Sequence, residues 1–290
     1  MSISHGLQGN PSSTKDYLKH LAARLPKDVL DLQTSMHFGD ESKYITATFS
    51  PKRYPKGIEI IHLTDVQYGH LACNVPKFIE YRDWILSEPN RFVFFGGDMI
   101  DAATAISVAS PYENTEEPQG QVFKFVELAA PIRHRVLGYV GGNHERRGVK
   151  TFGDLGHLIA TLLRIPYSSG KQFVDIHYGE HKPFRNSLWH GGSGSKTKGA
   201  KAQMLSRFMA QGASDCYWVG HLHDTIMLGE ARETRSENGT IELKKFAGVM
   251  SSSFLDYWGT YAEVMGLAPN DTNMWRLILL PNGHWELTLR

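Results

Sequence analysis

Cysteine is scarce in this chain, which has two cysteines, Cys73 and Cys216, among its 290 residues. Their positions follow no metal-binding spacing, so buried thiols are favoured over a disulfide, and a reducing compartment is indicated. Long apolar runs are also missing, because no stretch approaches the roughly 20 residues of a membrane-spanning helix. The opening residues, Met1-Ser2-Ile3-Ser4-His5-Gly6, lack the charged and apolar regions of a signal peptide. We therefore expect a soluble, cytoplasmic protein with no membrane partner.

The chain also lacks an excess of charge of either sign. Lys and Arg number 31, Asp and Glu number 30, and the formal net charge is +1. Such a balance gives no global attraction to nucleic acid or anionic lipid, although local patches can still bind phosphate. Hydrophobic residues make up 41% of the chain, which is enough for a substantial core. The length fits one large domain, or a domain with an extension.

What the chain does contain is a set of five short polar segments, each placed directly after an apolar run. The runs are Ile58–Leu63, Phe92–Phe95, Val136–Val140, Ser187–Trp189 and Cys216–Val219. Apolar runs of this length, bounded by Gly and Asp, are typical of buried strands. The polar segments are Asp65-Val66-Gln67, Gly97-Asp98, Gly142-Asn143-His144-Glu145, His190 and Gly220-His221-Leu222-His223. Because ligand sites in α/β sheets form where strands end, the pattern predicts one crevice that all five segments line.

The residue types in these segments indicate metal chemistry. Carboxylates, imidazoles and an amide oxygen suit divalent Mn, Fe, Zn or Mg, and thiolates play no part. Two cations held a few ångströms apart need a shared anionic ligand to offset their repulsion, and Asp98 is the natural bridge. Two such ions clamp a phosphoryl group and lower the pKa of a bound water. The sequence therefore predicts a two-metal hydrolytic site.

Each of these residues also has an ordinary structural interpretation. A lone His190 after a strand is more often a hydrogen-bonded structural residue, and Asp98 could cap a turn. Gln67 could be a polar surface residue beside an empty first site. His221 and His223 are two residues apart and would point to opposite faces in a strand, so binding two metals of one pair requires a loop after Gly220. The order of the five segments favours the metal site over these alternatives.

In this order the five segments resemble those of the calcineurin-like metallophosphoesterase family. Its pattern runs D-x-H, G-D-x-x-D, G-N-H-[DE], a lone His, and G-H-x-H, and the resemblance covers roughly residues 57 to 255. It implies a four-layer αββα sandwich of two mixed β-sheets flanked by helices. It also implies ligand sets, in which the first metal is held by Asp65, Asp98 and His223 with Gln67 beside it. The second metal is then held by Asp98, Asn143, His190 and His221.

The same resemblance implies the catalytic roles. Asp98 bridges the metals, and a hydroxide that bridges them attacks phosphorus. His144 is no ligand; it sits over the phosphoryl group, stabilises its charge and protonates the leaving oxygen. We expect two divalent ions, with Mn favoured and Fe, Zn, Mg or Ni as alternatives.

The departure from the family pattern is Gln67, where the family usually has His. An amide oxygen is a harder and weaker ligand than an imidazole nitrogen, so we expect lower affinity at the first site and a bias towards Mn or Mg. Asp65-Val66-Gln67-Tyr68 resembles the first motif of the manganese-dependent ADP-ribose and CDP-alcohol diphosphatases. This short similarity points to a diphosphate or diester substrate.

The chain divides at the first motif. Residues 1–56 are expected to form an N-terminal extension of one helix and one strand, packed on a metallophosphoesterase domain over residues 57–290. The helix would begin at Ser13 or Thr14 and end at Pro26, and the strand would span Tyr44–Phe49. Helical spacing recurs over Pro76–Leu86, Gln121–Ala130, Leu155–Leu163 and Ala200–Met209. After His223 the pattern predicts strands alone, over Ile226–Ala231, Ile241–Phe246, Arg276–Leu280 and Trp285–Leu289.

Several cations near the motifs are candidate substrate ligands. Arg146 and Arg147 could grip a second phosphate or a nucleic-acid backbone. Lys196 and Lys198 lie in a Gly- and Ser-rich segment whose amides could approach phosphate oxygens, with Lys201 adding charge; a solvated loop is the alternative. Ala103–Gln119 has the length and polarity of a lid or entrance loop.

Together these features predict a dinuclear metal-dependent phosphoric ester hydrolase. Its substrate would be a phosphodiester or diphosphate of nucleotide or nucleic-acid type, so a phosphodiesterase or nuclease is favoured over a monoesterase. The alternatives are a phosphomonoesterase, or a catalytically inactive scaffold of the same fold. The sequence leaves the physiological substrate and the oligomeric state open.

Overall fold

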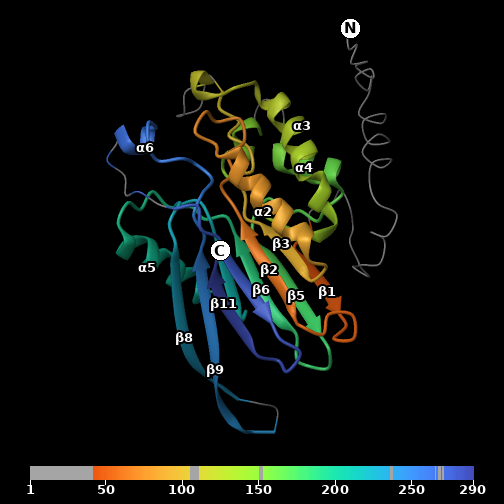
Figure 1. Cartoon of the computed structure of the whole chain (residues 1–290). Helices are drawn as coiled ribbons and strands as arrows, with labels where there is room; N and C mark the ends of the chain where they lie inside the picture. Colours follow the sequence, from red (N-terminus) through yellow and green to blue (C-terminus); the bar gives the residue numbers. More distant parts are fainter. Residues whose placement is uncertain are drawn as a thin grey trace, which may run out of the picture. The chain divides into compact units, whose positions relative to one another are not determined.

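Two mixed β-sheets pack face to face in the computed structural model, which describes residues 42–104, 111–149, 153–235, 238–264, 266, 269 and 271–290 (Figure 1). The six-stranded sheet has the order β1 (Tyr44–Phe49), β5 (Gln172–Tyr178), β6 (Phe184–Trp189), β7 (Cys216–Val219), β9 (Ile241–Met250) and β8 (Ile226–Arg235). The five-stranded sheet has the order β11 (Trp285–Leu289), β10 (Trp275–Leu279), β2 (Ile58–Leu63), β3 (Arg91–Phe95) and β4 (Val136–Tyr139).

Strand direction brings the polar segments to one edge of each sheet. β2, β3 and β4 pair in parallel, with Ile60 opposite Phe92 and Phe95 opposite Tyr139. β6 and β7 also pair in parallel, with Trp189 opposite Val219. The carboxyl ends of parallel strands lie at the same edge, so the residues that follow them can converge on one site.

The two sheets bury their apolar faces against each other. The ring of Phe94 on β3 lies 5.6 Å from that of Trp218 on β7, and Phe92 lies 4.6 Å from Phe49 on β1. The neighbouring Phe95 points the other way, because side chains alternate along a strand, and its ring lies 6.2 Å from that of Phe125 in a helix. β3 is thus apolar on both faces, as expected for a central strand covered on both sides.

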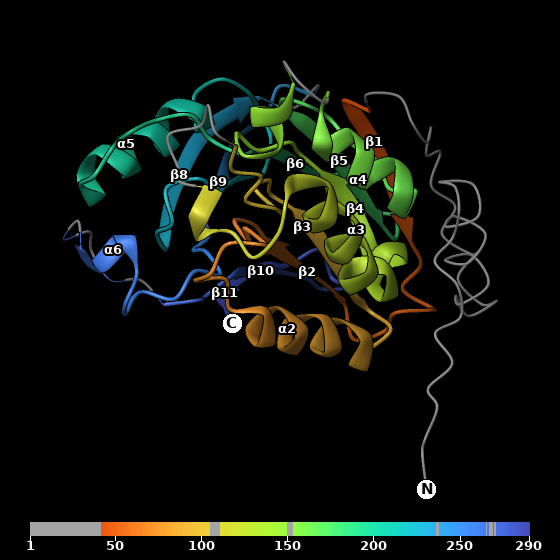
Figure 2. The same ribbon diagram turned by 90° about the horizontal axis from the view of Figure 1, so that it is seen from above.

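Helices cover the outer faces of both sheets (Figure 2). On the five-stranded side lie α2 (Val75–Ser87), α3 (Pro118–Ala129) and α4 (Leu155–Leu163). On the six-stranded side α5 (Lys198–Met209) packs against β7, β8 and β9. The remaining helical segments are short, namely η2 (Pro111–Glu113), η3 (Ala130–Arg135), η4 (Glu145–Gly148) and α6 (Tyr261–Val264). The layers are those of an αββα sandwich, which confirms the predicted fold class.

Side-chain caps set where these helices begin. The Asn74 side chain accepts a hydrogen bond from the Lys77 amide at 2.9 Å before α2, and Asp154 accepts one from Gly156 before α4. Thr197 caps α5 through the amide of Ala200. Such caps satisfy the first amides of a helix, which have no partner within it.

The predicted elements are found with small shifts of their ends, with three differences. β5 was not predicted, although Val174, Ile176 and Tyr178 alternate towards the core. α3 begins at Pro118, inside the segment expected to be a loop, and residues 105–110 of that segment lie outside the described part. β8 and β9 are longer than expected.

The N-terminal part of the prediction is described from residue 42 onwards. Tyr44–Phe49 is a strand, as predicted, and it pairs in parallel with β5. The helix expected between Ser13 and Pro26 lies outside the described residues. The domain boundary between residues 56 and 57 therefore stays a prediction. Among the described helices, none combines the length and apolar character that a membrane span requires.

Candidate metal centre

Strained backbone is concentrated where the sheets end. Seven non-glycine residues in the described part have positive φ, and they include Asp65, Gln67, Asp98, His221 and His223, with φ from 47° to 68°. This left-handed conformation is unfavourable for residues with a Cβ, and it persists where the surroundings enforce it. All five are among the seven metal ligands predicted from the sequence.

Close approach of the strand ends explains two of the glycines. A Cβ on Gly97 would come within 2.6 Å of His190 Nδ1 and 2.8 Å of the Gly142 amide. A Cβ on Gly220 would come within 2.1 Å of Thr64 Oγ1. Glycine is therefore required for the two sheets to bring their loops together.

The first group of predicted ligands is built on Asp65. Its Oδ1 lies 3.0 Å from His223 Nε2, and its Oδ2 accepts hydrogen bonds from Thr64 Oγ1 and from the His221 amide. Gln67 Nε2 lies 3.4 Å from His223 Nε2. The structure thus brings together Asp65, Gln67 and His223, the three residues of the predicted first ligand set other than Asp98.

The second group is built on Asp98. Its Oδ2 lies 3.1 Å from His190 Nε2, and the same nitrogen lies 3.2 Å from Asn143 Oδ1. Ligand atoms of Asp98, His190 and His221 all lie within 4.8 Å of one another. The other ring nitrogen of His190 is 2.8 Å from the carbonyl oxygen of Gly96, which fixes the direction of the ring.

His144 stands beside both groups. Its Nε2 lies 3.6 Å from Asp98 Oδ2 and 3.5 Å from Gln67 Nε2. On the other side of the ring, Nδ1 lies 2.9 Å from Asp101 Oδ1. Arg147 contacts the same pair, with Nη2 2.8 Å from His144 Nε2 and Nη1 donating to the carbonyl oxygen of Asp101. Asp101 therefore orients the imidazole.

Glu145 has a structural role that its place in the motif does not reveal. Its carboxylate is fully buried and accepts hydrogen bonds from the amides of Asp98, Met99 and Gly142 and from the hydroxyl of Tyr139. It thereby ties the loop after β3 to the loop after β4. The motif contained the residue, but its partners come from two strands, so spacing alone could not reveal the contact.

The charges of the site are strongly coupled. Burial alone would raise the pKa of Asp98, but the adjacent His144 and His190 outweigh it and hold this pKa well below its usual range. Burial alone would lower the pKa of His190, but Asp98 raises it to about 10. Burial and the neighbouring His190 lower the pKa of His221. The His190 imidazole therefore carries a proton that faces Asp98, whereas the His221 imidazole is neutral and has a lone pair available for a metal.

The donors divide by sheet. Oxygen donors come from loops of the five-stranded sheet, on Asp65, Gln67, Asp98 and Asn143, and nitrogen donors come from the six-stranded sheet, on His190, His221 and His223. Buried carboxylates are costly unless paired. Each carboxylate here faces an imidazole nitrogen that can hold either a proton or a metal. The residues present therefore fit divalent ions.

A pocket adjoins the second group. It has a volume of about 340 Å³, and its lining includes Asn143, Arg146, Arg147, Trp189 and His190. The two arginines predicted to bind substrate thus border the predicted ligands. Trp189, Ser169 and Gly170 also line the pocket, and none of them was among the predicted site residues.

The predicted lysines lie elsewhere. Neither Lys196 nor Lys198 lines this pocket, and the Lys198 side chain is 75% exposed. Lys201, expected to add charge for phosphate, is instead buried, with its ammonium 2.9 Å from the carbonyl oxygen of Leu222 and 3.0 Å from Asp224 Oδ2.

No model of a protein family matches the chain, and no curated protein matches it. Among solved structures it is similar to a conserved uncharacterized protein of Streptococcus pneumoniae TIGR4 described as a predicted phosphoesterase, with 14% identity, coverage of 80% of this chain and 98% of that chain, and a TM-score of 0.33. A metallophosphoesterase of Sphaerobacter thermophilus gives 14% identity, coverage of 80% and 87%, and a TM-score of 0.38. The NAD nucleotidase NadN of Haemophilus influenzae gives 12% identity, coverage of 80% of this chain and 49% of that chain, and a TM-score of 0.34. These similarities are too remote to define a family or a substrate for this chain.

Proposed function

We propose that this chain is a dinuclear metal-dependent phosphoesterase that hydrolyses a phosphodiester or a diphosphate. The observation that carries the proposal is the cluster of Asp98, His190 and His221, whose ligand atoms lie within 4.8 Å of one another. Asp65 and His223 form a second pair beside it, 3.0 Å apart. When bound, divalent ions at these residues would polarise a phosphoryl group and activate water, and Mn is the ion we favour.

The chain's own residues supply the remaining functions. Asp101 and Arg147 hold the His144 ring next to Asp98, where it can stabilise phosphoryl charge and pass a proton to the leaving oxygen. Burial and Arg147 would lower the pKa of His144, but Asp98 and Asp101 outweigh them and raise it. Protonation of Nε2 for general-acid catalysis would require Arg147 Nη2, which donates to this nitrogen at 2.8 Å, to move away. Asp98, which faces both His144 and His190, is positioned to couple the two groups.

The pocket supports a substrate with more than one charged or bulky group. Its lining includes Asn143 and His190 together with two arginines, Arg146 and Arg147. Arginine is well suited to bind phosphate oxygens in pairs. A monoester bound at the metals would leave this volume unused, whereas a diester or diphosphate would extend into it. A nucleotide or nucleic-acid substrate therefore fits better than a simple monoester.

The test is hydrolysis of bis-p-nitrophenyl phosphate and of p-nitrophenyl phosphate by metal-stripped protein titrated with Mn²⁺. We expect Mn-dependent cleavage of the diester at the higher rate. Cleavage of the monoester alone would overturn the diester assignment and leave a phosphatase. A protein that binds no Mn²⁺ and cleaves neither compound would be the inactive scaffold.

Salt dependence separates a nuclease from a hydrolase of small nucleotides. A nucleic acid that touches several cationic side chains releases counterions, so its binding falls steeply with salt concentration. A small nucleotide should show a shallow slope. The matched variants are Arg146→Ala and Lys198→Ala, because the first residue lines the pocket and the second does not. We expect Arg146→Ala to weaken substrate binding and Lys198→Ala to leave it unchanged.

A further inference from the structure

The loop after β7 carries two of the predicted ligands in an unfavourable backbone conformation. His221 and His223 have φ of 68° and 47°, and the amide of Leu222 between them donates to the carbonyl oxygen of Gly220 at 2.8 Å. Side chains with a Cβ adopt this conformation only where outside contacts hold it. The loop therefore needs anchors beyond its own sequence.

One anchor comes from the five-stranded sheet. The His221 amide donates to Asp65 Oδ2 at 2.9 Å, and His223 Nε2 lies 3.0 Å from Asp65 Oδ1. Both contacts use a carboxylate that is itself a predicted ligand. A bound cation would be coordinated by the same carboxylate oxygens. Asp65 alone therefore cannot hold the loop in its conformation independently of the metal.

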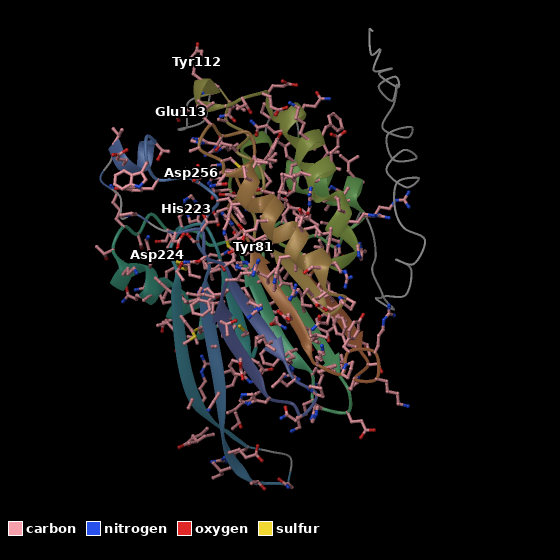
Figure 3. The ribbon with its side chains drawn as sticks, in the orientation of Figure 1. Tyr81, Tyr112, Glu113, His223, Asp224 and Asp256 are labelled. Atoms are coloured by element: carbon pink, nitrogen blue, oxygen red, sulfur yellow. The ribbon has the colours of Figure 1, made fainter. Side chains whose placement is uncertain are left out.

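The second anchor comes from α5 on the other side of the six-stranded sheet. The Lys201 ammonium donates to the Leu222 carbonyl oxygen at 2.9 Å and to Asp224 Oδ2 at 3.0 Å. The side chains of this ion pair are 11% and 8% exposed. Figure 3 shows Asp224 beside α5, with His223 of the same loop above it. One buried cation thus holds the residue between the two histidines and the residue after them.

We propose that Lys201 is a positioning residue for the metal centre: by fixing Leu222 and Asp224, it holds His221 and His223 where they can bind metal. The inference rests on the proposed function, because it takes these histidines as ligands. Lys201 itself touches neither metal nor substrate. Its part is to keep two strained ligands preorganised, so that metal binding does not have to order the loop.

Lys198 provides a matched control. It lies on the same helix and near the same carboxylate, with Nζ 3.6 Å from Asp224 Oδ1, but its side chain is 75% exposed. An exposed ion pair contributes little, whereas the loss of a buried partner leaves an unpaired charge. Lys198→Met therefore removes a cation from the same neighbourhood without removing the anchor.

The experiment measures the Kd for Mn²⁺ by equilibrium dialysis, together with amide hydrogen exchange of a peptide that spans residues 217–225. For Lys201→Met we expect Mn²⁺ affinity to fall by about tenfold or more, the range typical of lost outer-shell contacts, and exchange in this peptide to rise. Lys198→Met should change neither. Asp224→Asn keeps the shape of the side chain and leaves the hydrogen bond from Lys201 to the Leu222 carbonyl oxygen in place. We expect it to lower Mn²⁺ affinity less than Lys201→Met does.

Lys201→Arg completes the set, because it restores a donor to the same position. It should recover part of the metal affinity, which a purely apolar packing role would not predict. The proposal is overturned if folded Lys201→Met binds Mn²⁺ as tightly as the wild type, or if Lys198→Met has the same effect. If the wild type binds no Mn²⁺ while Lys201→Met still raises exchange, the metal assignment fails and the loop anchor stands.

Discussion

The Asp98 carboxylate lies 3.1 Å from Nε2 of His190, and the opposite nitrogen of that ring lies 2.8 Å from the Gly96 carbonyl oxygen. Asp98 raises the pKa of His190 to about 10 against the opposing effect of burial. At neutral pH, His190 therefore holds a proton at the nitrogen that would ligate a metal. Metal binding must displace this proton, because a ligating imidazole is neutral.

Mn²⁺ binding should accordingly release protons, and affinity should rise with pH from neutral towards about 10, the pKa of His190. The measurement is calorimetric titration in buffers of different ionisation enthalpy, which gives the number of protons released. His190→Ala should abolish the release from this ring and weaken binding. If the wild type and His190→Ala released the same number of protons, the proton would have to come from another group.

Removal of Asp98 and removal of His144 should have different consequences. Asp98→Ala is expected to lose both metal and activity, because its carboxylate faces His190 and His144. His144→Ala should keep the metal and lose activity by about 10²–10⁴-fold, the usual contribution of a positioned acid. Mn²⁺ content and turnover are measured on the same samples. Wild-type turnover in both variants would falsify the mechanism.

Gln67 is the residue at which this chain departs from the motif it otherwise resembles. Gln67→His should tighten the first site and raise its preference for Zn²⁺ over Mn²⁺, since imidazole suits zinc better than an amide oxygen does; we expect an effect on the order of tenfold. Competition dialysis with both ions measures it. Gln67→Ala should reduce the metal content. Unchanged stoichiometry in Gln67→Ala would mean that Gln67 is a bystander.

Glu145 should matter for folding even when no metal is present. Glu145→Gln replaces one acceptor oxygen by a donor that faces N–H groups, and an unsatisfied buried group costs about 1–3 kcal/mol. Urea unfolding in EDTA measures the loss of stability. The exposed Glu180, changed to Gln, is the control and should have little effect. A Glu145→Gln variant as stable as the wild type would show that the four hydrogen bonds contribute no net stability.

His62 should make stability depend on pH. It is fully buried between the sheets, with Nδ1 2.9 Å from Ser251 Oγ, and burial lowers its pKa to about 3. Between this value and about 6.5, the unfolded chain binds a proton that the folded chain does not, so stability falls as pH falls through this window, by at most about 1.4 kcal/mol per pH unit.

The measurement is urea unfolding in EDTA between pH 4 and pH 6. His62→Gln should reduce the slope of stability against pH by nearly one proton equivalent, whatever it does to stability itself. His284→Gln, on an exposed side chain, is the control variant. An unaltered slope in His62→Gln would mean that His62 is not kept neutral by folding.

The fold could largely be predicted because its strands are apolar and end at Gly or Asp. β2 and β7 have the predicted limits, and α4 matches as well. β5 is not predicted although Val174 and Ile176 alternate inward, because the exposed Phe173, directly before Val174, is also apolar and obscures the alternation of apolar and polar residues. Pro118 begins α3 inside a polar stretch, where proline suits the first turn of a helix as well as a loop.

The sequence indicates residues whose own side chains would contact the metal or substrate. It does not indicate residues that only position such side chains. Asp98 and His190 stand out by type and position. Glu145 and Lys201 do not, because their partners belong to other elements and their burial depends on how those elements pack. A lysine in a polar segment indicates a solvated cation, and only the packing of α5 against the sheet makes Lys201 an internal anchor.

The division of donors between the sheets has a consequence for assembly of the molecule. A folding intermediate that contained only the five-stranded sheet would present only oxygen ligands to a cation. An intermediate that contained only the six-stranded sheet would present only nitrogen ligands. Coordination of an ion by both oxygen and nitrogen would become possible only when the two layers dock. The absorption spectrum of a bound Co²⁺ ion would therefore report docking of the two layers, because its ligands would come from both sheets.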